Sequence, residues 1–114
     1  MSGGAFEYVM GNYNDATNSD GFWSMPEAKY YDKYTGTDSS SDFTKYHLGD
    51  ATKETLKTKS GAWYEDHSSS VSSSYPWVTR GGYYFVGATG VFSFACNNGD
   101  SYSTNSFRVV FDAL

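Results

Sequence analysis

The sequence is poor in the residues that usually build a helical core, and it can form no internal cross-link. Its 114 residues include one cysteine, two prolines and three leucines, with neither isoleucine nor glutamine. A single cysteine excludes an intrachain disulfide, and scarce aliphatic side chains argue against a helical bundle. The chain instead contains 11 Tyr, 8 Phe, 3 Trp and 12 Gly. This composition predicts a core of aromatic rings, built from short strands and many turns.

The fold class predicted from these features is α+β, rich in β-strands and loops. A chain of this length predicts a single domain, residues 1–114, that buries about two thirds of its unfolded surface on folding. The tryptophans Trp23, Trp63 and Trp77 are predicted to lie in its core. Cys96 is predicted to be a small buried thiol.

Basic residues are too few for nucleic-acid binding to be expected. Eight Lys and Arg face 13 Asp and Glu, so the formal net charge is −5, whereas binding to a phosphate backbone depends on clustered cations. No apolar run approaches the roughly 20 residues that span a bilayer. We therefore predict no nucleic-acid partner and no membrane insertion by this fragment.

Side-chain alternation predicts strands at both ends of the chain. Residues 5–10 read AFEYVM, and residues 106–114 form a terminal strand with one side made of Phe107, Val109 and Phe111. Between them, Asp50 is a fair N-cap for a short exposed helix in residues 49–59. Residues 24–34 fit either a capped helix or an extended chain, and their aromatic content favours the extended chain.

A further strand is predicted in residues 90–96, which read GVFSFAC. Alternation puts the rings of Phe92 and Phe94 on the inner face and turns Ser93 and Ala95 outward. The NNGD sequence that follows is a hairpin-turn signal. This segment therefore presents small side chains to solvent.

Metal and catalytic patterns are weak. Asp15 and Asp20 could ligate calcium with nearby Asn oxygens, but EF-hand spacing is missing and a solvated turn is the favoured interpretation. His47 and His67 lie far apart without the spacing of a zinc site. Serines are abundant, yet no G-x-S-x-G elbow or phosphate-binding loop occurs. We predict no metal and no cofactor, with calcium left open.

Three stretches, in the right order, resemble the formylglycine-generating-enzyme-like (sulfatase-modifying-factor) family. MSGGAFEYV is similar to the family's D-M-x-G-N-V-W-E-W segment through Gly4, Phe6, Glu7 and Tyr8. WVTRGGYY is similar to its W-x-x-R-G-G-S strand through Trp77, Arg80, Gly81 and Gly82. SFRVV is similar to its closing G-F-R-V through Phe107, Arg108 and Val109.

The resemblance implies a C-type-lectin-like fold that lacks the family's usual N-terminal part. The chain is then expected to be the C-terminal part of a longer protein. Physical reasoning adds that Arg80 and Arg108 act as internal clamps on carbonyl or carboxylate oxygens.

The family's enzymes use a copper-bound pair of cysteines to oxidise a substrate cysteine. Aligned on Arg80, the two positions hold Val86 and Val91, which have no lone pair to offer copper, and Cys96 alone cannot replace the pair. The prediction is therefore that the chain is no enzyme. A copper-dependent formylglycine-generating oxidoreductase is kept as an alternative.

A second branch of the same fold is formed by the variable proteins of diversity-generating retroelements. In them an RGG strand and a closing FR bracket positions diversified from Asn codons, which yield Tyr, Phe, Val, Ala, Ser, Thr, Asp, Gly, Cys or Asn. Residues 81–106 contain only members of this set. The same composition is typical of antibody paratopes, where Tyr gives area and Ser, Gly and Asn adapt their hydrogen bonds. A plain structural β segment is the alternative explanation.

The predicted function is non-enzymatic binding of a protein or carbohydrate ligand through the face of residues 83–104. Tyr83, Phe85 and Tyr102 would anchor the ligand, and Asn97, Asn98 and Asp100 would give directional hydrogen bonds. The full set of predicted contacts is Tyr83, Phe85, Val86, Ala88, Thr89, Ser93, Ala95, Asn97, Asn98, Asp100, Tyr102 and Thr104. Analogy predicts an extracellular, cell-surface or virion location. A structural module of a pilus or phage tail fibre is a further alternative.

Overall fold

Short strands and turns make up the described parts of the protein, and the helical segments bounded within them, η1 and η4, are single 3₁₀ turns. The computed structural model describes residues 4–17, 24–35, 55–58, 61–82 and 90–109. Along the chain the elements are β1 (Phe6–Tyr13), η1 (Ala28–Tyr30), β2 (Asp32–Tyr34), β3 (Leu56–Thr58), β4 (Gly61–Ala62), η4 (Trp63–Glu65), β5 (Trp77–Arg80), β6 (Phe94–Asn97) and β7 (Asn105–Ser106). The predicted β- and loop-rich character is confirmed.

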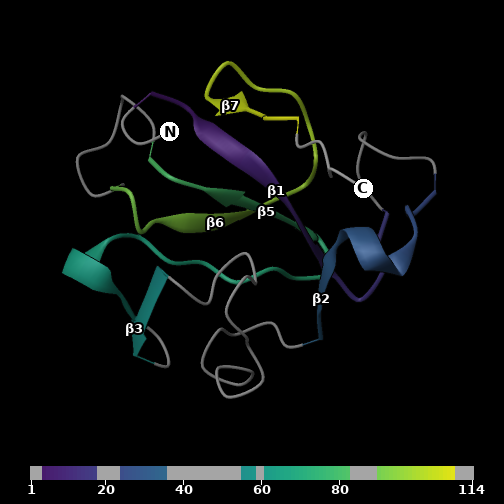
Figure 1. Ribbon diagram of the computed structural model, residues 1–114, viewed down its shortest axis with the longest axis horizontal. Helices are drawn as coiled ribbons and strands as arrows, with labels where there is room; N and C mark the ends of the chain where they lie inside the picture. Colours follow the sequence, from purple (N-terminus) through teal and green to yellow (C-terminus); the bar gives the residue numbers. More distant parts are fainter. Residues whose placement is uncertain (1–3, 18–23, 36–54, 59–60, 83–89, 110–114) are drawn as a thin grey trace, which may run out of the picture.

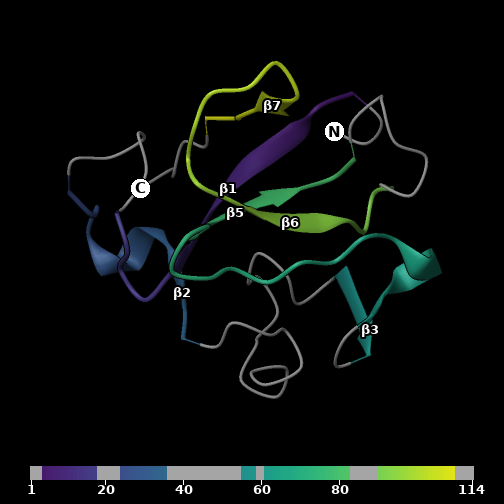
Figure 2. The same cartoon turned by 180° about the vertical axis from the view of Figure 1, so that it is seen from behind.

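The main sheet is organised around β1, which has neighbours on both of its edges (Figures 1 and 2). Strand β5 runs antiparallel to β1 on one edge, and β6 runs antiparallel to β5. On the other edge, β7 pairs in parallel with the start of β1, and β2 pairs in parallel with its end. The predicted first strand is thus confirmed, and it extends as far as Tyr13.

Cross-strand register decides which side chains share a face. Val9, Val78 and Cys96 lie opposite one another on β1, β5 and β6, and their common face contacts the core cluster of Tyr34, Val71, Val78 and Phe94. The neighbouring row, Tyr8, Thr79 and Ala95, takes the other face because successive side chains of a strand alternate. Two adjacent residues of β1 therefore serve different layers of the molecule.

The predicted aromatic core is only partly found. Phe94, Tyr34 and Trp77 are buried, as expected. Trp63 is 43% exposed, so its predicted core position is wrong. It follows a two-residue strand and lies in the η4 turn, outside the main sheet. Trp23 lies outside the described residues.

The helix predicted in residues 49–59 is wrong where the structure can be compared with it. Leu56–Thr58 form β3, which pairs antiparallel with β4, while residues 49–54 and 59–60 lie outside the described part. An exposed helix of two turns has little packing to offset its nucleation cost. Pairing with β4 supplies inter-strand hydrogen bonds instead.

The strand predicted over residues 106–114 can be compared only as far as residue 109, and no hairpin joins its start to β6. Up to that residue, the segment pairs through Asn105–Ser106, and their partner is β1 rather than β6. Phe107 and Val109 are exposed, and Phe111 lies outside the described residues. Hydrogen bonds to Phe6 hold this segment against the edge of β1: the Phe6 amide donates to the Thr104 carbonyl at 2.7 Å, and the Ser106 hydroxyl donates to the Phe6 carbonyl at 2.9 Å.

An ion pair ties the end of the described chain to the first strand. Arg108 Nε lies 2.7 Å from Glu7 Oε1, and the Glu7 residue is buried. Burial raises the pKa of the Glu7 carboxyl, but the hydrogen bond and charge of Arg108 oppose this, and the net pKa lies below its ordinary value. The predicted clamp role of Arg108 is confirmed.

Gly11 allows β1 to approach its neighbours closely. A Cβ at this position would lie 2.9 Å from Val78 Cγ2 and 3.0 Å from Tyr34 Cε2, both core side chains. At Gly4, in contrast, an added Cβ would meet nothing within 4 Å. The close packing of β2, β1 and β5 therefore depends on the missing side chain at residue 11.

Gly11→Ala is expected to lower the free energy of unfolding by about 1–3 kcal/mol, because the core side chains must shift to admit a methyl group. Gly4→Ala is the matched control and should change it by no more than about 0.5 kcal/mol. Urea denaturation of both variants measures the difference. Equal stability of the two variants would contradict the packing described for β1.

Arg108→Gln is expected to cost about 1 kcal/mol at neutral pH, because it removes the guanidinium that pairs with the buried Glu7 carboxylate. Since the folded-state pKa of Glu7 is lowered, its contribution is present above the ordinary value of 4.5 and is lost as the pH falls through the folded pKa. The gap between variant and wild type should therefore shrink towards pH 3. Lys29→Gln, which breaks a fully exposed pair with Glu27, should have no measurable effect at any pH.

Candidate functional site

The described residues contain only part of the predicted binding face. Five of its twelve members lie outside them, in residues 83–89: Tyr83, Phe85, Val86, Ala88 and Thr89. The other seven lie on or near β6 and in the chain that follows it. The site can therefore be built only from the second half of the predicted face.

The predicted outward position of Ser93 is wrong. Its side chain is completely buried, with a relative exposure of 0%. Strand β6 starts only at Phe94, and a turn precedes it in which the Ser93 amide donates to the Gly90 carbonyl at 3.1 Å. Strict alternation therefore does not extend back to Ser93, and Phe92 is half-buried rather than fully inward. Ala95 is half-buried on β6.

The remaining five predicted contacts belong to one segment, residues 97–105, which we call the polar loop: Asn97, Asn98, Asp100, Tyr102 and Thr104. Its turn is closed by its own side chains. The side-chain amide of Asn98 donates to Asp100 Oδ2, and the backbone amide of Asp100 donates to Asn98 Oδ1 at 3.3 Å. The backbone amide of Gly99 donates to Asn97 Oδ1 at 3.1 Å. Gly99 has a φ of 100°, a conformation that favours glycine.

Tyr8 anchors this loop to β1, which the chain left about ninety residues earlier. Its hydroxyl is aimed at Asn97 Oδ1 and lies 2.8 Å from the Asp100 carbonyl oxygen, and it accepts a hydrogen bond from the Asn105 amide at 3.4 Å. Burial and the nearby Asp100 carboxylate raise the pKa of Tyr8 to about 12. The phenol therefore stays protonated at neutral pH and remains a donor.

Tyr102 is the aromatic group that the polar loop exposes. It is 54% exposed, and its hydroxyl donates to Asp100 Oδ2 at 3.2 Å. This hydrogen bond to a carboxylate raises the pKa of Tyr102 above its ordinary value. The ring is thus held at its polar end, while much of its area faces solvent.

The candidate metal ligands have other partners or lie outside the described residues. Asp15 is bonded to Lys33 Nζ at 2.6 Å and to the Tyr31 hydroxyl, and Asp20 falls outside. Lys33 and Tyr31 lower the pKa of Asp15. Within the described ranges, no three His, Cys, Asp or Glu side chains gather to hold a metal ion. A calcium ion at Asp15 would have to displace the lysine ammonium.

The positions that align with the family's copper-binding cysteines can be compared with the structure only in part. Val91 is described and exposed, whereas Val86 is not described. The Cys96 thiol is half-buried with its Sγ 3.4 Å from Ser69 Oγ, so the predicted burial of Cys96 is incomplete. A valine side chain has no sulfur that could bind copper. The single thiol of the sequence, that of Cys96, contacts the Ser69 hydroxyl.

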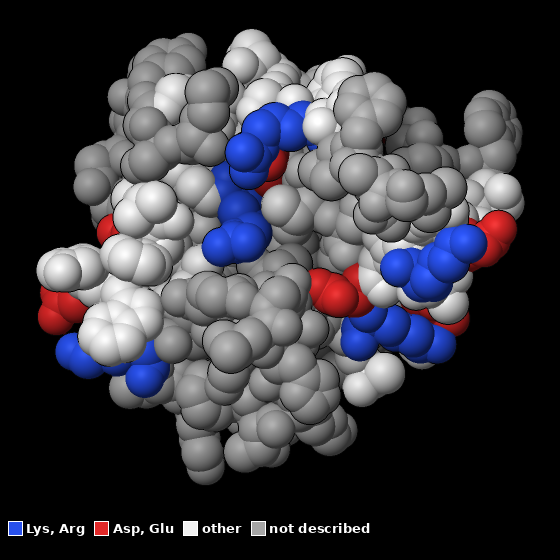
Figure 3. Space-filling view, viewed as in Figure 1, with Lys and Arg blue, Asp and Glu red and all other residues white. Residues whose placement is uncertain are grey.

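A shallow groove of about 350 Å³ lies apart from the polar loop. It is lined by Val9, Met10, Lys29, Tyr30, Tyr31, Asp32 and Arg80, none of them a predicted contact. On the face shown in Figure 3, basic side chains occur at separate places with acidic ones beside most of them. Across the described ranges, no helix is long and apolar enough to span a bilayer.

Sequence reasoning did not identify Tyr8 and Asn105 as parts of the site. Neither has a local signal, because their contacts join segments from opposite ends of the chain. A second omission is the exposed pair Trp63 and Tyr64, of which Trp63 was predicted to lie in the core. The adjacent acidic residues Glu65 and Asp66 were the available hint of a surface turn.

Tyr8→Phe is expected to destabilise the protein by about 1–3 kcal/mol, because Asn97 Oδ1 and the Asp100 carbonyl lose a partly buried donor. The folded-state pKa of Tyr8 is raised above its ordinary value of 10.0 to about 12. Its contribution is therefore complete below pH 10 and is lost as the pH rises through the folded pKa. Urea denaturation between pH 8 and 11.5 should show a decline in wild type that is smaller in Tyr8→Phe; equal declines would contradict the assignment.

Comparison of the sequence and the structure with known proteins leaves the family open. Searches against family models, curated proteins and solved structures gave no match. The likeness to formylglycine-generating-enzyme-like domains thus stays a prediction from three short motifs.

Proposed function

We propose that the protein is a non-enzymatic recognition module that binds a protein or glycan through the face of residues 83–104. The observation that carries this proposal is the polar loop, which is fixed by its own side chains and by Tyr8 while Tyr102 stays exposed. A loop that is already ordered loses little conformational entropy when it binds. A tyrosine held at its hydroxyl end provides rigid contact area, as tyrosines do in paratopes.

The roles of the polar side chains differ from those predicted for them. Asn98 and Asp100 bond to each other, and Asn97 bonds to Tyr8 and Gly99. We propose that these three side chains stabilise the conformation of the polar loop. Tyr102 and the backbone of the turn would then contact the ligand. Ser93 has no part in the contact because it is buried.

A C-type-lectin-like arrangement is the fold we propose for the whole domain. Support comes from the sheet, in which the three motif segments are neighbours. The first motif runs through β1, the second runs along β5 beside it, and the third follows β7 on the other edge. Glu7 of the first motif and Arg108 of the third form the 2.7 Å ion pair.

The rival functions predict different behaviour. A copper-dependent oxidoreductase needs thiolate ligands. The thiol of the chain's single cysteine, Cys96, shares a hydrogen bond with the Ser69 hydroxyl. A structural module of a pilus or tail fibre needs no exposed, preorganised tyrosine. We accordingly place recognition first, at a cell surface or on a virion.

Tyr102→Ala is expected to weaken ligand binding at least tenfold, because a central aromatic anchor usually accounts for about 2 kcal/mol or more of binding. Wild-type protein would be screened against an array of immobilised glycans and a phage library of displayed peptides, and binders measured by biolayer interferometry. Tyr30→Ala is the matched control, since Tyr30 is 58% exposed on η1.

Binding that falls in Tyr102→Ala and not in Tyr30→Ala supports the proposal. A set of binders of which none is weakened by Tyr102→Ala contradicts it, and so does the absence of any binder in both screens. Circular dichroism of both variants distinguishes a lost contact from a lost fold.

A further inference from the structure

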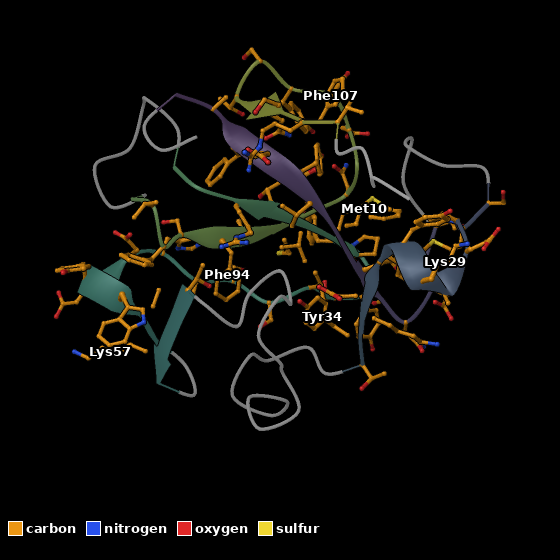
Figure 4. All side chains as sticks on the ribbon, in the orientation of Figure 1. Met10, Lys29, Tyr34, Lys57, Phe94 and Phe107 are labelled. Atoms are coloured by element: carbon orange, nitrogen blue, oxygen red, sulfur yellow. The ribbon has the colours of Figure 1, made fainter. Side chains whose placement is uncertain are left out.

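The η4 turn bears two exposed aromatic residues, Trp63 and Tyr64, and the Tyr64 ring stacks on the half-buried Phe92, which precedes β6. We call these three residues the aromatic ledge. Trp63 is 43% exposed and Tyr64 is 83% exposed. In Figure 3 uncharged surface lies at the lower left, next to the lysine that Figure 4 labels Lys57. Single exposed rings are common on protein surfaces, whereas adjacent exposed rings are typical of binding surfaces.

The backbone under the ledge adopts a conformation that is costly for residues other than glycine. Tyr64 has φ 58° and ψ 25°, and Glu65 has φ 60°. Two adjacent left-handed residues without glycine are strained, and such strain concentrates at functional sites. The Tyr64 ring, at 83% exposure, has gained no burial in exchange for that strain.

The turn that bears Trp63 and Tyr64 is joined to the turn that bears Phe92. Asp66 Oδ2 accepts a hydrogen bond from the Phe92 amide at 3.1 Å, and the Phe94 amide donates to the His67 carbonyl at 3.1 Å. Gly90 lies against the same carboxylate, where a Cβ would be 2.4 Å from Asp66 Oδ2. The two turns therefore form one platform.

The rings are arranged as a surface for stacking. Tyr64 and Phe92 stack with ring centroids 5.7 Å apart and an angle of 25° between their planes. The Lys57 ammonium lies 5.7 Å from the centre of the Trp63 ring. Exposed polar residues follow Trp63 and Tyr64 in the chain, among them Glu65 and His67.

We propose that the aromatic ledge binds a neutral pyranose ring of a β-1,4-linked gluco-configured oligosaccharide. In such a sugar all ring substituents are equatorial, so each face presents axial C–H groups to a π-face, which carries partial negative charge. Its hydroxyl groups lie at the ring edge, where Glu65, His67 and Lys57 can bond them. The carboxylates of Glu65 and Asp66 disfavour an anionic sugar.

The size of the ledge favours a sugar over a folded protein. A stable protein interface uses about 20–30 residues on each side, whereas the ledge offers three rings and a few polar neighbours. The ledge also lies at the opposite end of β6 from the polar loop, since Phe92 precedes that strand and Asn97 ends it. This inference therefore does not rest on the function proposed for the loop.

The test titrates the protein with cellotetraose and with chitotetraose, following tryptophan fluorescence and ¹H–¹⁵N chemical shifts. At least one of the two should bind saturably, with shifts centred on residues 63–67 and 90–92. Trp63→Ala and Tyr64→Gly should each weaken binding at least tenfold. Tyr64→Gly removes the ring while a glycine accepts the positive φ, so folding is kept.

Tyr30→Ala and Tyr102→Ala are the controls and should leave sugar binding unchanged. A β-1,4-linked galactotetraose, in which the C4 oxygen is axial, should bind at least tenfold more weakly than the better gluco-configured sugar. Absence of saturable binding by both β-linked sugars would overturn the proposal. So would binding that survives in both ledge variants, or binding lost in Tyr102→Ala alone, which would assign the sugar to the polar loop.

Discussion

The structure depends on β1 being paired along both of its edges. Strand β5 occupies one edge, while β7 and β2 share the other. No other described strand pairs with as many neighbours. Successive side chains of β1 also contact different parts of the molecule. Val9 faces the core, whereas the adjacent Tyr8 reaches the polar loop on the opposite face. Each residue that aligns β1 therefore influences the packing on one side and the loop on the other.

Loop order and sheet order are consequently coupled in this protein. The polar loop has no regular structure of its own until β7, and it is held by Tyr8, Asn105 and the turn's own amide groups. The aromatic ledge is fixed in the same manner, through Asp66 and the backbone of Phe94. Both surfaces are formed by short turns next to opposite ends of β6. Each turn is held by hydrogen bonds to the sheet or to its own side chains.

Patterns within a few neighbouring residues predicted secondary structure. They did not predict contacts between segments that lie far apart in the sequence. The alternation in AFEYVM was enough to find β1, and glycine and serine content was enough to predict short strands. Alternation failed at Ser93 because a turn precedes Phe94, and the N-cap at Asp50 suggested a helix where Leu56 pairs with Ala62. Tyr8 was beyond reach of sequence reasoning, since its partners follow about ninety residues later. The exposed Trp63 contradicts the rule that tryptophan lies inside, because it lies in the η4 turn, outside the main sheet.

Amide hydrogen exchange of the free protein is the most direct measurement of this coupling. If β1 holds the polar loop, the amides of Gly99 and Asn105, which donate to Asn97 Oδ1 and to the Tyr102 carbonyl, should be protected to a degree comparable with those of β1. Exchange of both amides at the rate of an unfolded chain, with β1 still protected, would contradict the account.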